Sequence, residues 1–373
     1  MKRVLFILDR AAHYHVDLLR ALEARLRDSA LELHLASGVV DAGATGRVGF
    51  DGSILANEHR YEYTERPVRD RTFRRVRGLG RLVAQVSPQV VICTAHVGNL
   101  SHWWLALNRR RLGIRLVAWQ CGYMYRDSAF KRWLLRRFVP RFDHQLAYHS
   151  NARDYALRHG ATTSQVTVMH NTINERRIQP LPKDEALALV RAMHPEIGAR
   201  KIVLFVGALL EEKRVEIIFG ALDLLRRDDL VLLVVGDGPH RGALQGAAAA
   251  RDDVVFAGAV VDGVGPYFDA ATMFVMPGTG GLGLNEAMAH GLPMLSGYAD
   301  GSADDLVIDG ETGYRLRDGS AAELATRMRE LLLNPETAVE MGRRARALIT
   351  GKFAFRSFVG CVAEVIATEA QRK

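Results

Sequence analysis

The chain has 373 residues, a formal net charge of +8 and 48% apolar residues. This length exceeds what one typical core needs, so two domains are expected, and the ordinary globular composition excludes a largely disordered chain. The longest apolar runs are strand-sized, so no membrane-spanning helix is expected. The three cysteines, Cys93, Cys121 and Cys361, are too far apart for a disulfide framework or a paired metal-ligand motif.

The first half of the chain alternates short β-rich runs with longer helical patterns. It opens directly into a buried strand at residues 4–8, without a leader-peptide pattern, which predicts a cytoplasmic protein. A helix is expected at 16–26, and further strands at 31–36, 90–94, 116–119 and 145–148. This alternation predicts an α/β fold with a parallel sheet.

A second and more regular series begins at Lys201. We expect strands at 202–206, 231–235, 254–256, 273–276 and 293–295, with helices at 214–226, 240–250 and 284–290. Between the two series, three prolines and the lack of a strand pattern indicate a linker. The predicted parts are an N-terminal domain at 1–175, a linker at 176–199, a C-terminal domain at 200–354 and a last helix at 355–373.

The charge is unevenly distributed along the chain. Residues 1–170 contain 27 Lys and Arg against 14 Asp and Glu, and the remainder contains 23 against 28. Basic clusters lie at 69–81, 109–111 and 131–141, and the last is interleaved with aromatic and aliphatic residues. Such a segment fits either an anionic membrane surface or a partly buried helix decorated with arginines.

The first chemically informative stretch runs from Phe205 to Val215. A strand ends at Gly207, and a short loop then brings Lys213 and Arg214 to an expected helix start. Open α/β sheets bind ligands beyond the carboxyl ends of their strands. Two cations placed there are suited to neutralising a diphosphate, and solvated surface positions are the alternative.

A second stretch, Val234 to Arg241, also joins a strand to a glycine turn. It is weak evidence alone, because Arg241 occupies the position of the third glycine of a dinucleotide-binding fingerprint.

The third stretch, Met276 to Ala289, combines a buried strand, a glycine-rich loop and a helix. Free backbone N–H groups at a helix start can bind phosphate oxygens. We expect Glu286 in the first turn of this helix, where its carboxylate could accept hydrogen bonds from ribose hydroxyls or simply be a first-turn charge.

Together these stretches resemble the retaining glycosyltransferase family 4, which has the GT-B fold. The resemblance covers about residues 200–316 and continues through Gly291-Leu292-Pro293, Gly301 and the run from Ile308 to Tyr314. It implies two Rossmann-like domains whose parallel sheets face each other across a cleft, with the C-terminal helix crossing back to the first domain. It also implies transfer from a nucleoside-diphosphate sugar, such as a UDP- or GDP-sugar, with retention of anomeric configuration.

Specific roles follow from the resemblance. The residues expected to bind the donor diphosphate are Gly207, Lys213, Arg214, Gly280, Gly281, Leu282 and Gly283. Glu286 is expected to hold the ribose, and Lys213 and Glu286 to carry catalysis. No Asp-x-Asp motif is present, so we expect neither a metal nor a cofactor, with the basic loop stabilising the leaving diphosphate instead.

The chain departs from the family pattern at several points. Ala208 occupies the position of an arginine that follows the glycine, which leaves open whether Arg214 or another residue replaces it, and Gly278 occupies that of the first glutamate of the E-x7-E motif. The usual N-terminal Gly-Gly loop is absent, and Gln120 or Cys121 stands where the family has a histidine. The donor sugar and the acceptor are therefore left open by the sequence.

Acceptor-side residues are sought after the strands of the first domain. His13 and His15 follow the first strand and His96 follows a later one, and Gln120 and Cys121 complete the candidates. A lone histidine is more often a structural hydrogen-bonding group.

The expected acceptor is a glycan or a lipid-linked precursor of the bacterial cell surface, with the basic first domain contacting the inner face of the membrane. No nucleic-acid partner is expected. The alternatives are a nucleotide-sugar epimerase on the same fold and a non-catalytic basic binding module, which would not account for the ordered glycine loops.

Overall fold

The structure is a computed structural model. It describes residues 1–9, 11–38, 52–68, 71–122, 128–260, 262–297 and 301–372. By their contacts, the described residues up to Asn171 and those from Arg356 onward form one unit, and Thr172–Phe355 form the other. Arg10, which follows the first strand, and Arg69, which begins the basic cluster at 69–81, lie outside the described residues.

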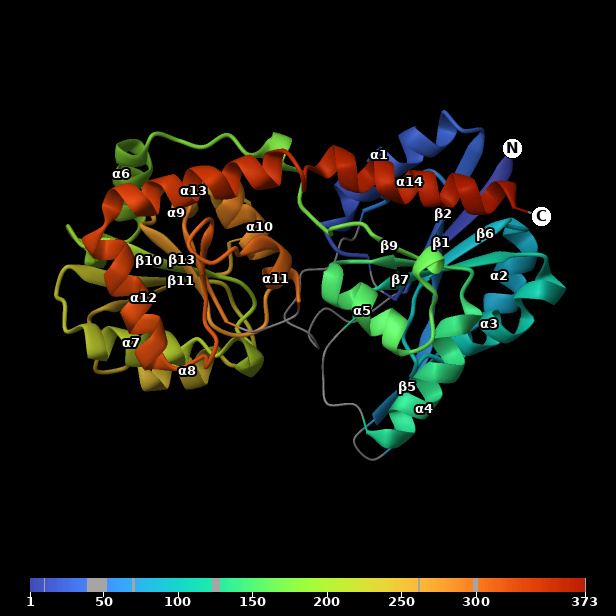
Figure 1. Cartoon of the computed structure of the whole chain (residues 1–373), viewed down its shortest axis with the longest axis horizontal. Helices are drawn as coiled ribbons and strands as arrows, with labels where there is room; N and C mark the ends of the chain where they lie inside the picture. Colours follow the sequence, from blue (N-terminus) through green and yellow to red (C-terminus); the bar gives the residue numbers. More distant parts are fainter. Residues whose placement is uncertain are drawn as a thin grey trace. The chain divides into compact units, whose positions relative to one another are not determined.

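The first unit is built on a seven-stranded parallel sheet with the strand order β3-β2-β1-β6-β7-β8-β9. Its strands are β1 (Lys2–Leu8), β2 (Leu31–Gly38), β3 (Glu58–Tyr61), β6 (Val90–Thr94), β7 (Arg115–Gln120), β8 (His144–Ala147) and β9 (Val166–Val168). Its helices are α1 (His15–Arg27), α2 (Leu79–Val86), α3 (Leu100–Leu112), α4 (Ala129–Phe138) and α5 (Ser150–Arg158), and they lie on both faces of the sheet (Figure 1).

A hairpin that the sequence did not predict is inserted before α2. Strands β4 (Tyr63–Val68) and β5 (Arg71–Val76) pair antiparallel in a small separate sheet. The basic cluster predicted at 69–81 thus lies partly on a β-hairpin.

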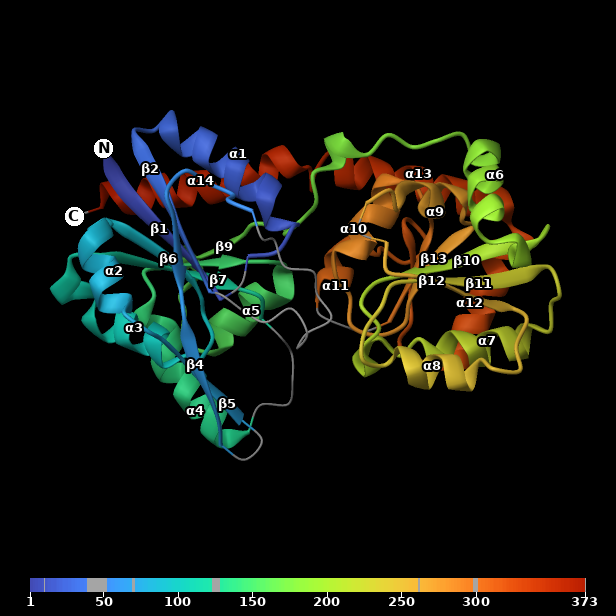
Figure 2. The same ribbon diagram turned by 180° about the vertical axis from the view of Figure 1, so that it is seen from behind.

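The last helix, α14 (Phe355–Gln371), packs on the first unit, as expected. Glu369 is buried and lies 2.7 Å from the guanidinium of Arg115 on β7. The Lys2 ammonium donates to the Ala370 carbonyl at 2.6 Å, so the two described ends of the chain meet on this unit (Figure 2).

The second unit contains a six-stranded parallel sheet with the order β12-β11-β10-β13-β14-β15. Its strands are β10 (Lys201–Val206), β11 (Leu230–Val235), β12 (Val254–Gly258), β13 (Met273–Met276), β14 (Met294–Ser296) and β15 (Gly313–Arg315). Its helices are α6 (Lys183–Met193), α7 (Glu216–Leu225), α8 (Arg241–Ala247), α9 (Gly265–Ala270), α10 (Leu282–Ala289), α11 (Ser302–Leu306), α12 (Ala321–Leu333) and α13 (Pro335–Thr350). Buried aliphatic and aromatic residues of strands and helices form one core.

The predicted linker at 176–199 contains helix α6, which packs against α9. Ala186 and Val190 of this helix are fully buried in the core of the second unit. The segment therefore belongs structurally to the second unit, because its helix has an apolar face that the proline-based argument did not use.

Candidate functional site

The second sheet has its topological switch point between β10 and β13. From β10 the chain moves outward to β11 and β12, and it then returns to place β13 on the other side of β10. Ligands of open α/β sheets bind beyond the carboxyl ends of the strands at such a point. The loops that follow β10 and β13 are the two loops that the sequence predicted to bind a diphosphate.

These two loops contact each other directly. The Lys213 ammonium donates to the carbonyl oxygens of Thr279, at 2.5 Å, and Gly280, at 2.7 Å. The Thr279 amide donates to the Glu212 carbonyl at 2.9 Å. The cation and the glycine-rich loop, which are more than sixty residues apart in the sequence, are therefore parts of one site.

Two glycines permit this close approach. A Cβ atom on Gly278 would lie 2.1 Å from the Glu212 carbonyl oxygen and 2.4 Å from the Lys213 carbonyl carbon. A Cβ atom on Gly283 would lie 3.0 Å from the Val206 carbonyl oxygen. At position 278 the space that a side chain would need is filled by the backbone of the loop that carries Lys213, which we call the lysine loop. A glutamate therefore does not fit there in this arrangement.

Helix α10 begins at Leu282, two residues earlier than predicted, because Gly281 has an extended conformation with φ 155° and ψ −173°. The first-turn amides of Leu282 and Gly283 have no intrahelical acceptor and are available to an anion. Glu286 consequently lies in the second turn, and the expectation that it lies in the first turn was wrong.

Glu286 is a largely buried carboxylate. Its burial raises the pKa of the carboxyl group, and His290 one turn later partly opposes this shift. His290 itself is held by Asp269, with 2.6 Å between Nδ1 and a carboxylate oxygen. A carboxylate with little water around it gains more from a hydroxyl donor than a solvated one.

The positions of the two cations differ from the prediction. Lys213 ends the short 3-10 helix at Glu211–Lys213, Arg214 follows in a left-handed conformation with φ 54°, and α7 begins only at Glu216. The helix start predicted at residue 214 was therefore two residues too early. The Arg214 guanidinium donates to the Gly319 carbonyl at 3.2 Å.

Gly207 and the Gly236 turn support this edge of the sheet. The Gly207 amide donates to the Val235 carbonyl at 3.0 Å, and the Leu209 amide donates to the Asp237 carbonyl at 2.9 Å. A Cβ atom on Gly236 would lie 1.9 Å from the Gly207 carbonyl oxygen. The second motif of the sequence thus has a structural role here, because it stacks the loop after β11 on the loop after β10.

The first sheet has its own switch point, between β1 and β6. Asp9 follows β1, lies 3.5 Å from the Arg74 guanidinium and accepts a hydrogen bond of 3.3 Å from the buried amide of Asn99. His96 follows β6. Burial lowers the pKa of its imidazole, and the charge of Asp9 only partly opposes this shift. Asp9 and His96 thus flank a second polar site.

Asp9, Arg74 and Asn99 were not among the predicted site residues. The position of Asp9 directly after the first strand is a signal that could have identified it. Arg74 gave no such signal, because it reaches this edge from the inserted hairpin.

The remaining acceptor-side candidates have different environments. His13 is exposed, and His15 accepts a hydrogen bond from the Ala12 amide at 3.1 Å, a structural contact at the start of α1. Gln120 is buried at the end of β7, and its amide nitrogen has no hydrogen-bond partner among the described residues. Cys121 follows it and interacts with Tyr148, whose pKa burial raises well above its usual value.

Within the described residues, no group of three or more His, Cys, Asp or Glu side chains is arranged to hold a metal ion. Asp304 of the Asp304-Asp305 pair lies in α11 and forms an ion pair of 2.8 Å with Arg315.

Both units match known glycosyltransferase domains. Residues 14–177 match the family model described as Glycosyltransferase Family 4, and residues 200–334 match the one described as Glycosyl transferases group 1. The two matches together cover most of the chain, and both are to glycosyltransferase families. It is 26% identical over 222 residues to the sulfoquinovosyl transferase SQD2 of Arabidopsis thaliana, covering 57% of this chain and 42% of that protein.

A second relative is the GDP-mannose-dependent alpha-(1-6)-phosphatidylinositol monomannoside mannosyltransferase of Mycolicibacterium smegmatis. The identity is 29% over 201 residues, which cover 50% of this chain and 52% of the relative. The chain thus spans about half the length of the curated relatives it matches.

Among solved structures, Anabaena HepE in complex with UDP has a TM-score of 0.77 at 16% identity, with 99% of this chain and 100% of HepE covered. This similarity shows the GT-B fold, with two Rossmann-like domains, that the sequence predicted.

Proposed function

We propose that this glycosyltransferase moves a hexosyl group from a nucleoside-diphosphate sugar to an acceptor hydroxyl, with retention of anomeric configuration and without a metal. The observation that carries the proposal is the contact of Lys213 with the Thr279 and Gly280 carbonyls at the switch point of the second sheet. It brings a cation, free helix amides and the Glu286 carboxylate into one small region.

The chemistry follows from these groups. The bond between the anomeric carbon and the diphosphate oxygen breaks, a bond from that carbon to the acceptor oxygen forms, and the acceptor proton passes to the leaving diphosphate. Negative charge grows on the diphosphate during this step. The Lys213 ammonium and the amides of Leu282 and Gly283 are suited to stabilising that charge, and Glu286 to accepting hydrogen bonds from the ribose.

The proposed donor is a UDP- or GDP-hexose. HepE was solved with UDP and with UDP-glucose, and the mycobacterial relative is named as GDP-mannose-dependent. The proposed acceptor is a lipid-linked or polysaccharide precursor of the cell surface. Support comes from the phosphatidylinositol monomannoside in that relative's name and from the basic first unit, and the proposed location is the cytoplasmic face of the membrane.

The test is a thermal-shift titration with UDP, GDP and their hexose conjugates on the wild type and on Lys213→Ala and Glu286→Ala. Loss of charge-assisted hydrogen bonds is expected to weaken the best donor about tenfold to a hundredfold in each variant. Lys201→Ala is the matched control, because Lys201 opens the same strand at the opposite edge of the sheet. Full retention of donor binding in Lys213→Ala would refute the proposed site.

Product analysis separates transfer from epimerisation. A transferase releases one nucleoside diphosphate for each acceptor modified, whereas an epimerase converts one nucleotide sugar into another and leaves the diphosphate bond intact. Accumulation of an epimeric nucleotide sugar without free nucleoside diphosphate would contradict the proposed reaction.

A further inference from the structure

Helices α3 and α4 of the first unit carry apolar side chains on their outer faces. On α4, Phe130 is 56% exposed and Trp133 is 51% exposed, and their rings stack with 5.9 Å between centroids. On α3, Leu107 is 63% exposed, in line with the exposed Leu100 and Trp104. Large apolar side chains that gather in this way mark interaction surfaces.

The two helices are neighbours on one face of the first sheet. The ring of Trp103 on α3 lies 4.6 Å from that of Phe138 on α4, and the Arg109 side chain donates to the Arg141 carbonyl at 2.6 Å. The inner sides of both helices enter the same core through Leu105 and Phe138. Their outer sides therefore form a single surface, which we call the α3–α4 face: Leu100, Trp104, Leu107, Arg111, Phe130, Arg132, Trp133, Arg136 and Arg137.

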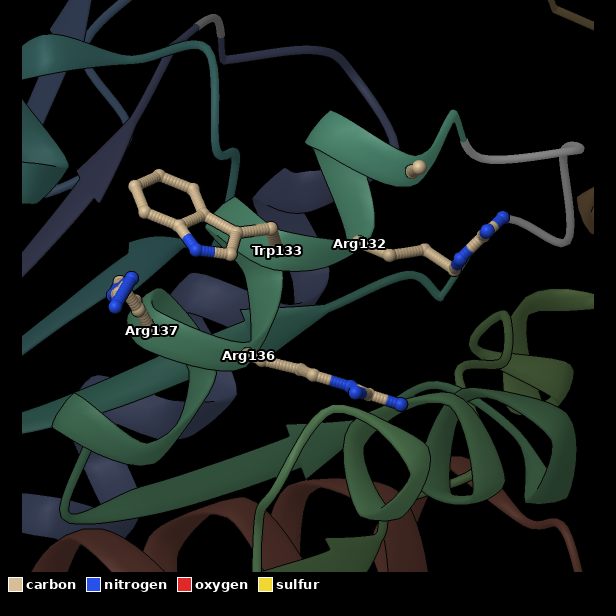
Figure 3. A pocket seen from close by; sticks show the side chains of 5 residues that line it. Arg132, Trp133, Arg136 and Arg137 are labelled. Carbon is tan, nitrogen blue, oxygen red and sulfur yellow. The ribbon is translucent and has the colours of Figure 1, made fainter.

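Cations surround these apolar groups. Arg132, Arg136 and Arg137 are exposed on α4, and the Arg137 guanidinium lies 4.1 Å from the centroid of the Trp133 ring. Figure 3 shows Trp133 and Arg137 on one side of the helix and Arg132 and Arg136 on the other, around a pocket that these side chains line. Arginine that stacks on an aromatic ring retains its charge for a second, anionic partner.

The part of the sequence that contains both helices is strongly basic. Between Glu65 and Asp143 the sequence contains sixteen arginines and Lys131, against Asp70 and Asp127. A protein partner with a mixed surface does not require such an excess, whereas an anionic lipid surface attracts the cations that are exposed on the α3–α4 face. Tryptophan and phenylalanine beside arginine are the residues that enter the headgroup region of a bilayer.

We propose that the α3–α4 face docks on an anionic phospholipid bilayer, with Phe130 and Trp133 inserted among the headgroups and the arginines on lipid phosphates. The inference extends the proposed use of a membrane acceptor and names the surface that makes the contact. The position of the face suits that use, because α4 lies near the switch point of the first sheet. The charge of Lys131, in the first turn of α4, contributes to lowering the pKa of His96 at that switch point. None of the helices in the described part of the chain has the length and apolar character to span a bilayer.

The experiment is flotation of the full chain with vesicles of phosphatidylglycerol and phosphatidylcholine, compared with vesicles of phosphatidylcholine alone. Binding is expected only to the anionic vesicles and is expected to fall between about 0.05 M and about 0.5 M salt, because salt screens the attraction. Each cation near the surface contributes about a fivefold factor, so Arg132→Gln, Arg136→Gln and Arg137→Gln together are expected to lower binding about a hundredfold. Phe130→Ser with Trp133→Ser is expected to reduce the blue shift of tryptophan fluorescence on binding to what Trp104 contributes.

Matched controls lie in the second unit. Arg329→Gln, Arg343→Gln and Arg346→Gln remove the same charge from exposed positions of α12 and α13, and Leu333→Ser removes an exposed apolar group. These controls are expected to bind vesicles as the wild type does. Equal losses in both sets, no binding of the wild type to anionic vesicles, or binding to heparin without binding to vesicles would each overturn the inference.

The outcome is separable from that of the proposed function. Vesicle binding is measured without donor or acceptor, and Lys213→Ala is expected to float like the wild type. The α4 variants are in turn expected to retain the thermal shift with the best donor, which also shows that they are folded.

Discussion

Glu286 combines two requirements that oppose each other. Its carboxylate is buried on the second turn of α10, where the loss of water disfavours the charged form and raises its pKa. The same charge is what the proposed ribose contact uses. A residue that costs stability in the free protein and contributes to ligand binding is typical of functional sites.

We predict that Glu286→Gln raises the melting temperature of the free protein slightly at pH 7 and weakens donor binding. Because the folded-state pKa is above the unfolded value, the folded carboxyl group holds its proton more tightly. Stability is therefore lost as the pH rises through the interval between the two values, and glutamine avoids this loss. Melting temperatures measured from about pH 4 to about pH 8 should differ between variant and wild type only at the upper end. A variant that melts lower than the wild type at pH 7 would contradict this account.

The sequence was sufficient to place Lys213 and the glycines at 280–283 in the loops after β10 and β13, because a strand end, a loop and a helix start are local patterns. It was not sufficient to predict the conformation and the hydrogen-bond partner of Arg214. The left-handed conformation of this residue and its bond to Gly319 depend on a loop about a hundred residues further along the chain. Which cation replaces the arginine missing at Ala208 is thus a question of tertiary structure.

At the scale of elements, most of the parallel strands were predicted because each is a short apolar run between turn signals. The edge strands β3, β9 and β15 were missed, because they are only three or four residues long and β3 and β15 contain charged residues. The β4–β5 hairpin was missed, since β5 is rich in arginine and neither strand has an apolar alternation. The start of α10 was also missed, because a glycine-rich loop and the first turn of a helix have the same composition here.

Helix α14 is attached to the first unit through a buried charge. The Glu369 side chain is 1% exposed and lies 2.7 Å from Arg115 and 2.6 Å from Arg372. Removing one partner of a buried ion pair leaves the other partner uncompensated, which costs more than the pair contributes.

Glu369→Gln is accordingly expected to lower the free energy of unfolding by about 1–3 kcal/mol, less than for an isolated buried pair, because Arg372 is half exposed and Arg115 keeps its ion pair with Asp143. Urea denaturation followed by circular dichroism measures the change. Glu364→Gln is the control on the same helix, since Glu364 is exposed, and it should alter stability by less than about 0.5 kcal/mol. Equal effects of the two substitutions would show that the buried pair does not hold the helix.

For the whole molecule, hydrogen exchange can show which of the two units binds the nucleoside diphosphate. A bound nucleoside diphosphate is expected to slow exchange at 209–213 and 279–283, because its phosphates bind amides and hold the lysine loop in place. The strand ends of the first unit, including Asp9 and His96, should be unaffected without acceptor. Protection confined to the first unit would contradict the proposed donor site in the second unit.

Among the described residues, the chain enters the second unit at Thr172 and leaves it at Phe355, so this part of the second unit is continuous in sequence and the first unit is not. A ribosome must therefore finish the second unit before it delivers the helix that completes the first. Until then Trp119, whose ring lies 6.1 Å from that of Phe358, lacks its cover, and Arg115 lacks Glu369. A nascent chain shortened before Arg356 would lose part of the earlier domain's core, even though every strand of that domain had already been synthesised.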